Sequence, residues 1–333
     1  MKRKFLARTA AAFACICCLF TSIPAKAAQT SDLTGLPVDD AVYARRPAAV
    51  MIDNSKAAQP QSGLSGADII YEAYAEGQVT RLMAVFENYD GLTKIGPLRS
   101  CRDYFIHWAC EYDPIFIHYG GPDLYVSTYY SLPQVNNLNG TKMGNTMSFR
   151  SSDRKAPHNA YTGASYIAKG VASKGYAASH TSYYQGSHFK FATGPALTPS
   201  QGISAVKVTP GYSSNKPVFT YNAQDGKYYR SQFGKAHTDK ESKTQLCFDN
   251  VIIQYADTIV RDKKGYLFAQ TIDRGKSGYF IANGRAIPVV WTKDSLSGIT
   301  HFYDTAGKEI KVNPGKTFIC VMPADQSKNT VIQ

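Results

Sequence analysis

The sequence has little of what a metal, redox or membrane-spanning protein needs. Outside residues 1–28 it has no C-x-x-C motif, no H-x-x-x-H motif and no clustered His and Cys, so no zinc or redox centre is expected. It has no apolar run of about 20 residues, the length that crosses a bilayer core. Charged residues make up 19% of the chain and hydrophobic residues 44%. This composition excludes collagen, coiled coils and wholesale disorder, and no internal repeat is present.

The first 27 residues are typical of a secretory signal peptide. A basic start precedes an apolar run over residues 10–20, and Ala25-Lys26-Ala27 forms an A-x-A cleavage pattern. We therefore expect an exported protein at the cell surface or outside the cell, with no transmembrane helix in the mature chain. Cys15, Cys17 and Cys18 follow a poor lipobox, so these cysteines do not predict a lipid anchor.

The 333 residues exceed one ordinary core, so two domains are expected after the leader. Residues 32–195 predict an α/β domain, because strands, a hairpin and helices alternate there. The expected elements are strand 47–53, hairpin 68–76 and 79–88, a helix after Ser100, strand 115–118, a long loop over 131–160 and helix 164–173. Residues 205–331 contain short alternating segments between Gly and Asn turns, which predict a mostly antiparallel β domain.

Four cysteines follow the leader, and an exported protein can form disulfides. Cys101 and Cys110 are nine residues apart on a predicted helix, on opposite faces, so they cannot pair. Cys247 and Cys320 both follow strand-like runs and are the better candidate pair. Cys101 beside two arginines is only a weak candidate nucleophile, since no histidine is near it in the sequence.

Positive charge is unevenly placed in the mature chain. It has 32 Lys and Arg against 25 Asp and Glu, and all of the excess lies after residue 204, mostly as Lys. Scattered lysines suit loose attraction to an anionic wall or lipid surface, or form no more than a soluble basic face. The neutral first half carries seven arginines, the residue that grips carboxylates and phosphates in fixed geometry. A nucleic-acid partner is not predicted.

The predicted hairpin places two carboxylates around one guanidinium. A two-residue turn at Gly77-Gln78 sets Tyr74 opposite Arg81, with Glu72 and Glu76 as diagonal neighbours of that arginine. Glu72 and Glu76 are candidate catalytic acid and base residues. The alternative is a half-buried salt bridge that stabilises the hairpin.

Arg99-Ser100-Cys101-Arg102 at a predicted helix start is the strongest local signal. We expect Ser100 to cap the helix, with Asp103 approximating a capping box. The two arginines and the helix end favour an anion, so Arg81, Arg99, Ser100, Arg102 and Arg154 are the candidate anion-binding residues. Alternatively, nearby carboxylates neutralise the arginines internally.

Two histidines could serve such a site. His118 ends a buried strand just before Gly120-Gly121, and His158 lies on the long loop near Arg154. Singly, each is more often a structural hydrogen-bonding residue. Together they are candidate catalytic acids or bases near an anion.

Segments of the chain resemble the YerB-like family, bacterial proteins described as lipoproteins and built from a two-part domain of unknown function. The resemblance rests on residues 46–54, 61–72, 76–81, 95–102 and 156–159, and in the second half on 237–239, 250–252, 291–293 and 313–315. It implies a two-domain cell-envelope protein of Gram-positive-type bacteria. The family is typically lipid-anchored, whereas this chain lacks a convincing lipobox, so the two cues on anchoring differ.

A looser similarity, over about 70 residues, is to the LytR-CpsA-Psr phosphotransferases. It follows the order Asp53, Ser65-x-x-Asp68, 98–103 and 119–121. That family holds magnesium with acidic residues and a lipid-linked pyrophosphate with arginines. The similarity implies Asp53 and Asp68 as Mg²⁺ ligands and Arg81, Arg99 and Arg102 as phosphate ligands.

Two functional hypotheses follow. In the first, the protein binds an anionic cell-wall component or a wall-synthesis partner through an arginine pocket, without a cofactor. In the second, it is a Mg²⁺-dependent phosphotransferase or other transferase acting on cell-wall glycopolymers. Whether it is an enzyme is left open, and a third possibility is that the arginines are purely structural.

Overall fold

The computed structural model describes residues 29–198 and 200–333. The expected signal peptide, its cleavage site, and Cys15, Cys17 and Cys18 lie outside these residues. Among the helices of the described part, none combines the length and apolar character needed to span a bilayer.

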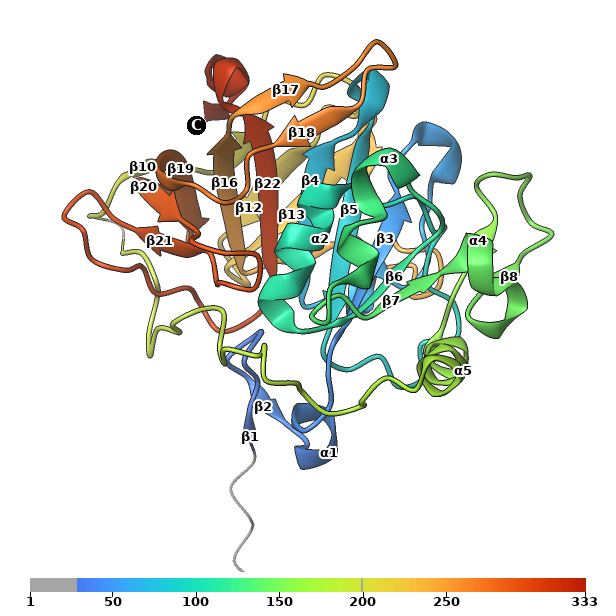
Figure 1. The fold of residues 1–333 in the computed structure, drawn as a ribbon. Coiled ribbons are helices and arrows are strands. Elements are labelled where there is room, and N and C mark those ends of the chain that lie inside the picture. Colours follow the sequence, from blue (N-terminus) through green and yellow to red (C-terminus); the bar gives the residue numbers. More distant parts are fainter. Residues whose placement is uncertain (1–28, 199) are drawn as a thin grey trace, which may run out of the picture.

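An eleven-stranded mixed sheet forms the centre of the molecule (Figure 1). Its strands run in the order β10-β20-β19-β16-β22-β4-β5-β3-β6-β7, with β21 beside β20. The first half of the chain supplies β3 (Ala48–Asp53), β4 (Ile69–Tyr74), β5 (Thr80–Phe86), β6 (Ile115–His118) and β7 (Asn137–Asn139). The second half supplies β10 (Ile203–Ser204), β16 (Asn250–Ala256), β19 (Arg274–Ala282), β20 (Arg285–Thr292), β21 (His301–Tyr303) and β22 (Thr317–Pro323). The two halves share one sheet, because β22 lies between β16 and β4.

Seven of these strands point in the same direction, β20 among them, because β20 and β16 are both antiparallel to β19 between them. The pairs β16–β22, β22–β4, β3–β6 and β6–β7 are parallel, and β4 and β3 are both antiparallel to β5 between them. Their carboxyl ends therefore share one edge of the sheet, called the carboxyl edge below. Ligands of α/β proteins commonly bind at such an edge.

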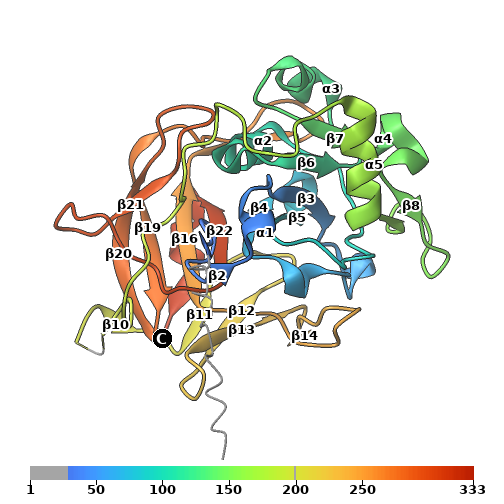
Figure 2. The ribbon, with the colours of Figure 1, turned by 90° about the horizontal axis from the view of Figure 1, so that it is seen from below.

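A second sheet and the helices cover the two faces of the large sheet (Figure 2). The second sheet is antiparallel and consists of β11 (Lys207–Thr209), β12 (Val218–Asn222), β13 (Lys227–Gln232), β14 (Lys235–Ala236), β15 (Cys247–Phe248) and β23 (Val331–Ile332). The helices are α1 (Asp40–Tyr43), α2 (Asp103–Ala109), α3 (Asp123–Val126), α4 (Gly140–Met143) and α5 (Ala164–Lys174). Small pairs are β1 (Gln29–Thr30) with β2 (Pro37–Val38), β8 (Phe149–Arg150) with β9 (Ala160–Tyr161), and β17 (Thr258–Val260) with β18 (Leu267–Ala269).

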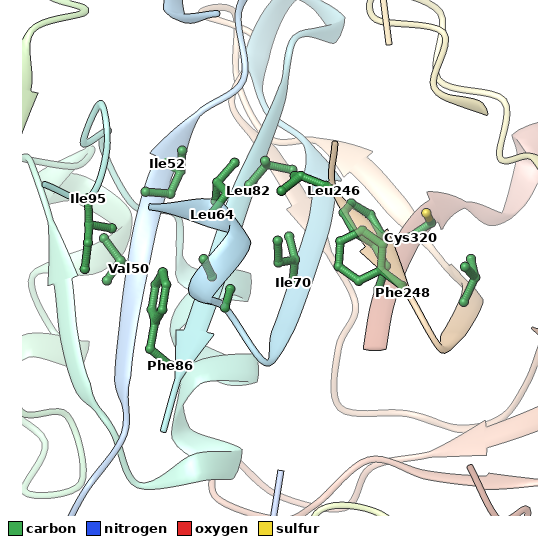
Figure 3. Close-up of a cluster of buried hydrophobic side chains, with 14 of the residues drawn as sticks. Val50, Ile52, Leu64, Ile70, Leu82, Phe86, Ile95, Leu246, Phe248 and Cys320 are labelled. Carbon is green, nitrogen blue, oxygen red and sulfur yellow. The ribbon is translucent and has the colours of Figure 1, made fainter. Parts of the chain in front are cut away.

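Both faces of the large sheet are buried. Along β3, Val50 and Ile52 join a cluster that packs against the second sheet, whereas Ala49 and Met51 join a cluster that packs against α2. Successive side chains of a strand point to opposite faces, so a strand buried on both sides is apolar throughout. Figure 3 shows the first cluster, which contains Ile70 of the first half and Phe248 of the second half. The core therefore spans both halves of the chain.

The predicted strands and the helix after residue 163 are confirmed, with α5 ending at Gly175 in left-handed geometry (φ 65°). The region of 131–160, expected to be one long loop, contains β7, α4, β8 and the start of β9. The second half is mostly antiparallel, as predicted, and the first half is a mixed sheet with helices.

The predicted register of the β4–β5 hairpin is wrong by one residue. Tyr74 pairs with Thr80, and Ala73 pairs with Arg81. The turn has three residues, Glu76–Gln78, and both Gly77 and Gln78 have positive φ. A slip of one residue sends side chains to the opposite face of a sheet. Glu72 therefore faces the second sheet and Arg81 faces α2, so the expected neighbour relation between Glu72 and Arg81 does not exist.

Two further expectations are wrong. Helix α2 begins at Asp103 with Arg102 at the N-cap, and Ser100 is not its cap, because its Oγ donates to the Tyr119 carbonyl at 3.1 Å. The backbone of residues 99–101 is instead held by the sheet edge, with Arg99 N donating to the Met51 carbonyl at 3.0 Å. Cys247 and Cys320 are free thiols and form no disulfide, as are Cys101 and Cys110.

Candidate anion-binding site at the carboxyl edge

Asp53, the last residue of β3, is the centre of a polar cluster at the carboxyl edge. Its side chain is only 3% exposed. Its Oδ1 accepts the backbone N–H of Ser55 at 2.9 Å, and its Oδ2 lies 2.7 Å from His158 Nδ1. Burial alone raises the pKa of Asp53, but the Ser55 N–H, the Arg99 charge and the His158 hydrogen bond outweigh it and hold this pKa below its usual range. Asp53 is therefore a carboxylate at neutral pH.

His158 is oriented by that carboxylate. A carboxylate only accepts hydrogen bonds, so the Nδ1 that faces Asp53 carries a proton and donates it. In the neutral ring Nε2 is then the unprotonated nitrogen. Nε2 has no hydrogen-bond partner within residues 29–198 and 200–333, and the side chain is 24% exposed. The ring thus presents an open acceptor to solvent.

Arg99 is the third member of the cluster. Its backbone is fixed between two strands, since Arg99 N donates to the Met51 carbonyl and Tyr119 N donates to the Arg99 carbonyl, each at 3.0 Å. Its Nε lies 3.4 Å from Asp53 Oδ2. Its two terminal NH₂ groups make no hydrogen bond to the described part of the chain, and the side chain is 29% exposed. These two groups form the free face of the guanidinium.

Arg81 and Arg102 share a single carboxylate beside this cluster. Arg102 Nε donates to Glu76 Oε1 at 2.5 Å, and its NH2 donates to Oε2 of the same residue. Arg81 NH2 lies 3.7 Å from Glu76, and its NH1 donates to the Ser100 carbonyl at 2.6 Å. Burial and the nearby Arg102 lower the pKa of Arg81 to about 10. Both arginines thus have partners inside the protein. Two guanidinium groups share one carboxylate, so Arg81, Arg102 and Glu76 together carry one excess positive charge.

The ion pair also decides the state of Glu76. Burial raises the pKa of Glu76, but the hydrogen bonds and charge of Arg102 outweigh burial and hold this pKa below its usual range. Glu76 is therefore a charged anchor for two arginines, which fits the alternative of a stabilising salt bridge.

The loop that carries His158 adds basic side chains to the same face. Arg150 stacks over Tyr119 at 5.1 Å and donates to Asn159 Oδ1 at 2.6 Å. Arg154 donates to the backbone carbonyls of Ala58 and Pro60, so its charge has no carboxylate partner within the residues described. Asp153 is the acidic residue of this loop, and it pairs with Lys94 and Lys240. The face around Arg99 is therefore electropositive.

A cavity of about 380 Å³ adjoins this face, and it is lined by Lys56, Gln59, Pro60, Lys235 and neighbouring residues of β13 and β14. It is connected to the cluster through Pro60, whose carbonyl Arg154 holds. A larger cavity of about 550 Å³ lies elsewhere, beside Tyr255 and Tyr279, and contains none of the charged cluster. Neither cavity is lined by Asp53, Arg99 or His158.

His118 lies inside the protein and not on this face. Its ring is fully buried and stacks between Phe116 and Tyr130, at 5.3 and 5.2 Å. Its Nδ1 lies 2.9 Å from the Gly120 carbonyl and its Nε2 lies 3.3 Å from Asn137 Oδ1. Both nitrogens face oxygen acceptors, so the ring makes both hydrogen bonds only as an imidazolium. Burial lowers the pKa of His118, but Cys101 and these two contacts outweigh burial and raise it. The expectation that His118 reaches an anion together with His158 is wrong.

The buried His118 has a neighbour that the sequence did not reveal. Cys101 lies beside it, and its Sγ is 2.9 Å from the Tyr130 hydroxyl. Burial raises the pKa of the Cys101 thiol, but His118 and Tyr130 outweigh burial and lower it. The thiol is fully buried, so a ligand cannot reach the sulfur in this conformation.

Glu72 is also remote from the anion site. It lies fully buried between the two sheets and forms an ion pair with Arg230 at 2.6 Å. Its Oε1 accepts hydrogen bonds from Asn54, Thr80 and Asn215. The expectation that Glu72 is an acid or base beside Arg81 is therefore wrong, because the hairpin register places it on the opposite face.

Asp53 and Asp68 cannot share a metal ion. Asp68 immediately precedes β4, at the edge opposite to the carboxyl edge, about 16 Å from Asp53 along the strands. It accepts the Glu87 N–H at 2.7 Å, and burial raises its pKa to about 6. Within residues 29–198 and 200–333, no group of three or more His, Cys, Asp or Glu is arranged to hold a metal. The residues do not fit the expected Mg²⁺ site.

The structure thus brings Arg81, Arg99, Ser100, Arg102, Glu76 and His158 to one edge, together with Asp53, and it places Arg154 at the border. It leaves Glu72, His118 and Asp68 elsewhere. The pairing of Asp53 with His158 was missed, since the residues are 105 positions apart and neither flanking sequence points to the other.

Two family models match the chain. The N-terminal and C-terminal domains of the protein of unknown function DUF3048 match residues 33–177 and 206–319. The molecule therefore has two family domains, although they share the central sheet.

Individual proteins match most of the chain. It is 33% identical over 306 residues to a protein of Bacillus subtilis (strain 168) described as "Putative lipoprotein YerB", covering 87% of this chain and 85% of the relative. The crystal structure of YerB protein from Bacillus subtilis superposes with a TM-score of 0.80 at 29% identity, covering 92% of this chain and 99% of that chain.

Proposed function

The chain belongs to the DUF3048 family of proteins of unknown function, and on that premise we propose that it binds an anionic cell-envelope component at the Arg99–His158 face. The signal-peptide pattern of residues 1–27 and the description of its Bacillus subtilis relative as a lipoprotein support a location at the cell surface.

The free guanidinium of Arg99 is the observation that carries the proposal. Its Nε is directed to Asp53, while its two terminal NH₂ groups are without partners in the described residues. A guanidinium with two open donors matches a phosphate or carboxylate in bidentate geometry. Asp53 is the one carboxylate beside Arg99, and Arg150 and Arg154 have no carboxylate partner within the described residues, so the face keeps positive charge.

The shape of the site favours a polymer over a small ion. Basic side chains continue from Arg99 to Arg150 and Arg154, and then to Lys56 and Lys235 at the adjoining cavity of about 380 Å³. Repeated anionic groups of one chain can contact such a path, and each contact adds attraction that salt weakens. We propose that Arg81 and Arg102 support the path through their surplus charge rather than by direct contact.

Replacing Arg99 with glutamine should weaken binding of poly(glycerol phosphate) by about 10-fold to 100-fold, because a hydrogen bond to a charged group contributes about 1.5–3 kcal/mol. Isothermal titration calorimetry at low salt measures the effect. The matched control is Arg274→Gln, which removes the same charge from a residue 75% exposed on β19.

In the control, affinity should change less than twofold, because β19 lies five strands from β3, about 24 Å away. Parent-like affinity of Arg99→Gln would overturn the proposed site. Equal losses of affinity in both variants would also overturn it, because they would show that net charge alone attracts the polymer.

A further inference from the structure

We propose that the Asp53–His158 pair makes this site catalytic, with His158 Nε2 as the general base for hydrolysis of a phosphodiester held by Arg99. The inference rests on the proposed anion site and adds a reaction to it. Its geometric basis is the 2.7 Å contact between Nδ1 and the carboxylate, which leaves the other ring nitrogen open to solvent.

Asp53 is suited to orient the ring and not to react. Its side chain is almost fully buried, and its two oxygens are engaged by Ser55 N, His158 and Arg99. A carboxylate on Nδ1–H fixes the tautomer in which Nε2 accepts a proton, and it stabilises the imidazolium that forms. Asp53 is therefore a positioning residue, and His158 is the catalytic residue.

The attacking group is water. The Ser55 hydroxyl lies 3.4 Å from His158 Nδ1, the nitrogen that Asp53 already occupies, so Nε2 cannot deprotonate it in this arrangement. A water molecule that donates a hydrogen bond to Nε2 is therefore the nucleophile, since Ser55 cannot be activated by this nitrogen.

The electrophile carries one negative charge. One open guanidinium faces the site, and a phosphodiester offers it two oxygens that share a single charge. Binding of those oxygens by Arg99 also stabilises the charge that develops on them as the water attacks.

The step balances without a co-reactant. One water proton passes to His158 Nε2 as the water oxygen forms a bond to phosphorus. The bond from phosphorus to the leaving oxygen breaks on the opposite side of phosphorus. That oxygen takes a proton from solvent water, and the Nε2 proton returns to solvent. The products are a phosphomonoester and an alcohol, and His158 returns to its neutral form. A polymer bound along the basic face would be cut between repeats.

Release of p-nitrophenolate from bis(p-nitrophenyl) phosphate and loss of chain length in poly(glycerol phosphate) measure the reaction. His158→Gln should lower the rate by about 10²-fold to 10⁴-fold, the usual contribution of general acid–base catalysis. Its affinity for inorganic phosphate should stay within threefold, because Arg99 is unchanged. The control is His180→Gln, which removes another histidine whose Nδ1 faces a carboxylate, that of Asp113, at 3.3 Å. That variant should keep the parent rate.

Asp53→Asn tests the positioning role. We expect a rate loss of at least about 100-fold and a changed ¹⁵N spectrum of His158, from the Nδ1–H tautomer in the parent towards Nε2–H in the variant. If Asp53 has only a structural role, the Asp53→Asn variant should be less stable than the parent while the tautomer of His158 stays unchanged.

The outcomes separate the two proposals. If the parent protein binds phosphate through Arg99 but hydrolyses neither substrate between pH 5 and 9, the catalytic inference is overturned and the binding function stands. Parent-like turnover by His158→Gln would also overturn it. If neither inorganic phosphate nor poly(glycerol phosphate) binds through Arg99, both proposals fail.

Discussion

Replacing Arg230 with methionine should lower the free energy of unfolding by about 3–5 kcal/mol at pH 7, because it leaves a buried carboxylate without its counter-charge. Arg230 and Glu72 are both fully buried and lie 2.6 Å apart. Arg230 comes from β13 in the second sheet and Glu72 from β4 in the large sheet. The ion pair therefore joins the two halves of the chain across the core.

The surroundings of Arg230 explain why the loss is large. Its NH1 contacts His237 Nδ1 at 2.5 Å, and His237 Nε2 contacts Gln61 Oε1 at 2.8 Å. Burial and the Arg230 charge hold the pKa of His237 well below its usual range, so the ring is neutral and accepts from the arginine. Removing Arg230 thus breaks a chain of buried hydrogen bonds as well as the ion pair.

Urea denaturation of three variants checks this expectation. Arg274→Met, which breaks the exposed pair with Asp294, should cost less than about 1 kcal/mol. The double variant Glu72→Gln/Arg230→Met should regain about 1 kcal/mol or more over Arg230→Met, since the uncompensated charge is gone. A loss below about 1 kcal/mol for Arg230→Met would contradict the account of this core.

Glu111→Gln should be about as damaging, with a loss of about 3–5 kcal/mol at pH 7. Glu111 is fully buried and lies 3.2 Å from Lys293 Nζ and 2.6 Å from His188 Nε2. It also accepts the N–H and the hydroxyl of Thr300, at 2.9 and 2.8 Å. The variant leaves the buried ammonium of Lys293 without a carboxylate.

The loss should depend on pH in a definite direction. Burial raises the pKa of Glu111, but Lys293 and His188 outweigh burial and lower it to about 2, below the usual value of 4.5. A carboxyl whose pKa is lower in the folded state stabilises the fold above the unfolded value and loses that effect as pH falls through the folded value. The difference between parent and Glu111→Gln should therefore be constant above about pH 5 and shrink between pH 4.5 and 2.

Thermal unfolding from pH 2 to pH 8 measures this difference. Glu309→Gln is the control, since Glu309 pairs with Lys190 and His301 at the surface and its side chain is 21% exposed. Its effect should be small at every pH. A loss for Glu111→Gln that stays the same down to pH 2 would contradict the assigned network.

Local patterns predicted the elements but not their partners. The apolar runs of β3, β6 and β22 identify strands, because strands buried on both faces are apolar throughout. Nothing in residues 317–322 indicates that β22 pairs with β4, almost 250 positions earlier. The shared sheet is a consequence of long-range pairing, which local periodicity does not encode.

The hairpin shows how one turn residue decides the placement of a charge. Gly77 at the first position of a two-residue turn is compatible with type II′ geometry, which predicted Arg81 opposite Tyr74. Gln78 also adopts positive φ, and the turn includes Glu76. That single-residue difference sends Glu72 to Arg230 and leaves Glu76 with Arg102 and Arg81.

The candidate site was predictable in part. Arg99 and Arg102 stand out in sequence beside a helix start, and His158 was predicted as a candidate acid or base on a long loop. Its attachment to Asp53 depends on tertiary contacts, among them those of Arg154 with Ala58 and Pro60.

The crystal structure of the protein grown with inorganic phosphate tests the central claim most directly. The account predicts one phosphate bound by the terminal NH₂ groups of Arg99, on the side to which His158 Nε2 is open. A structure in which those groups instead bind a carboxylate of the protein, with phosphate absent from the carboxyl edge, would contradict it.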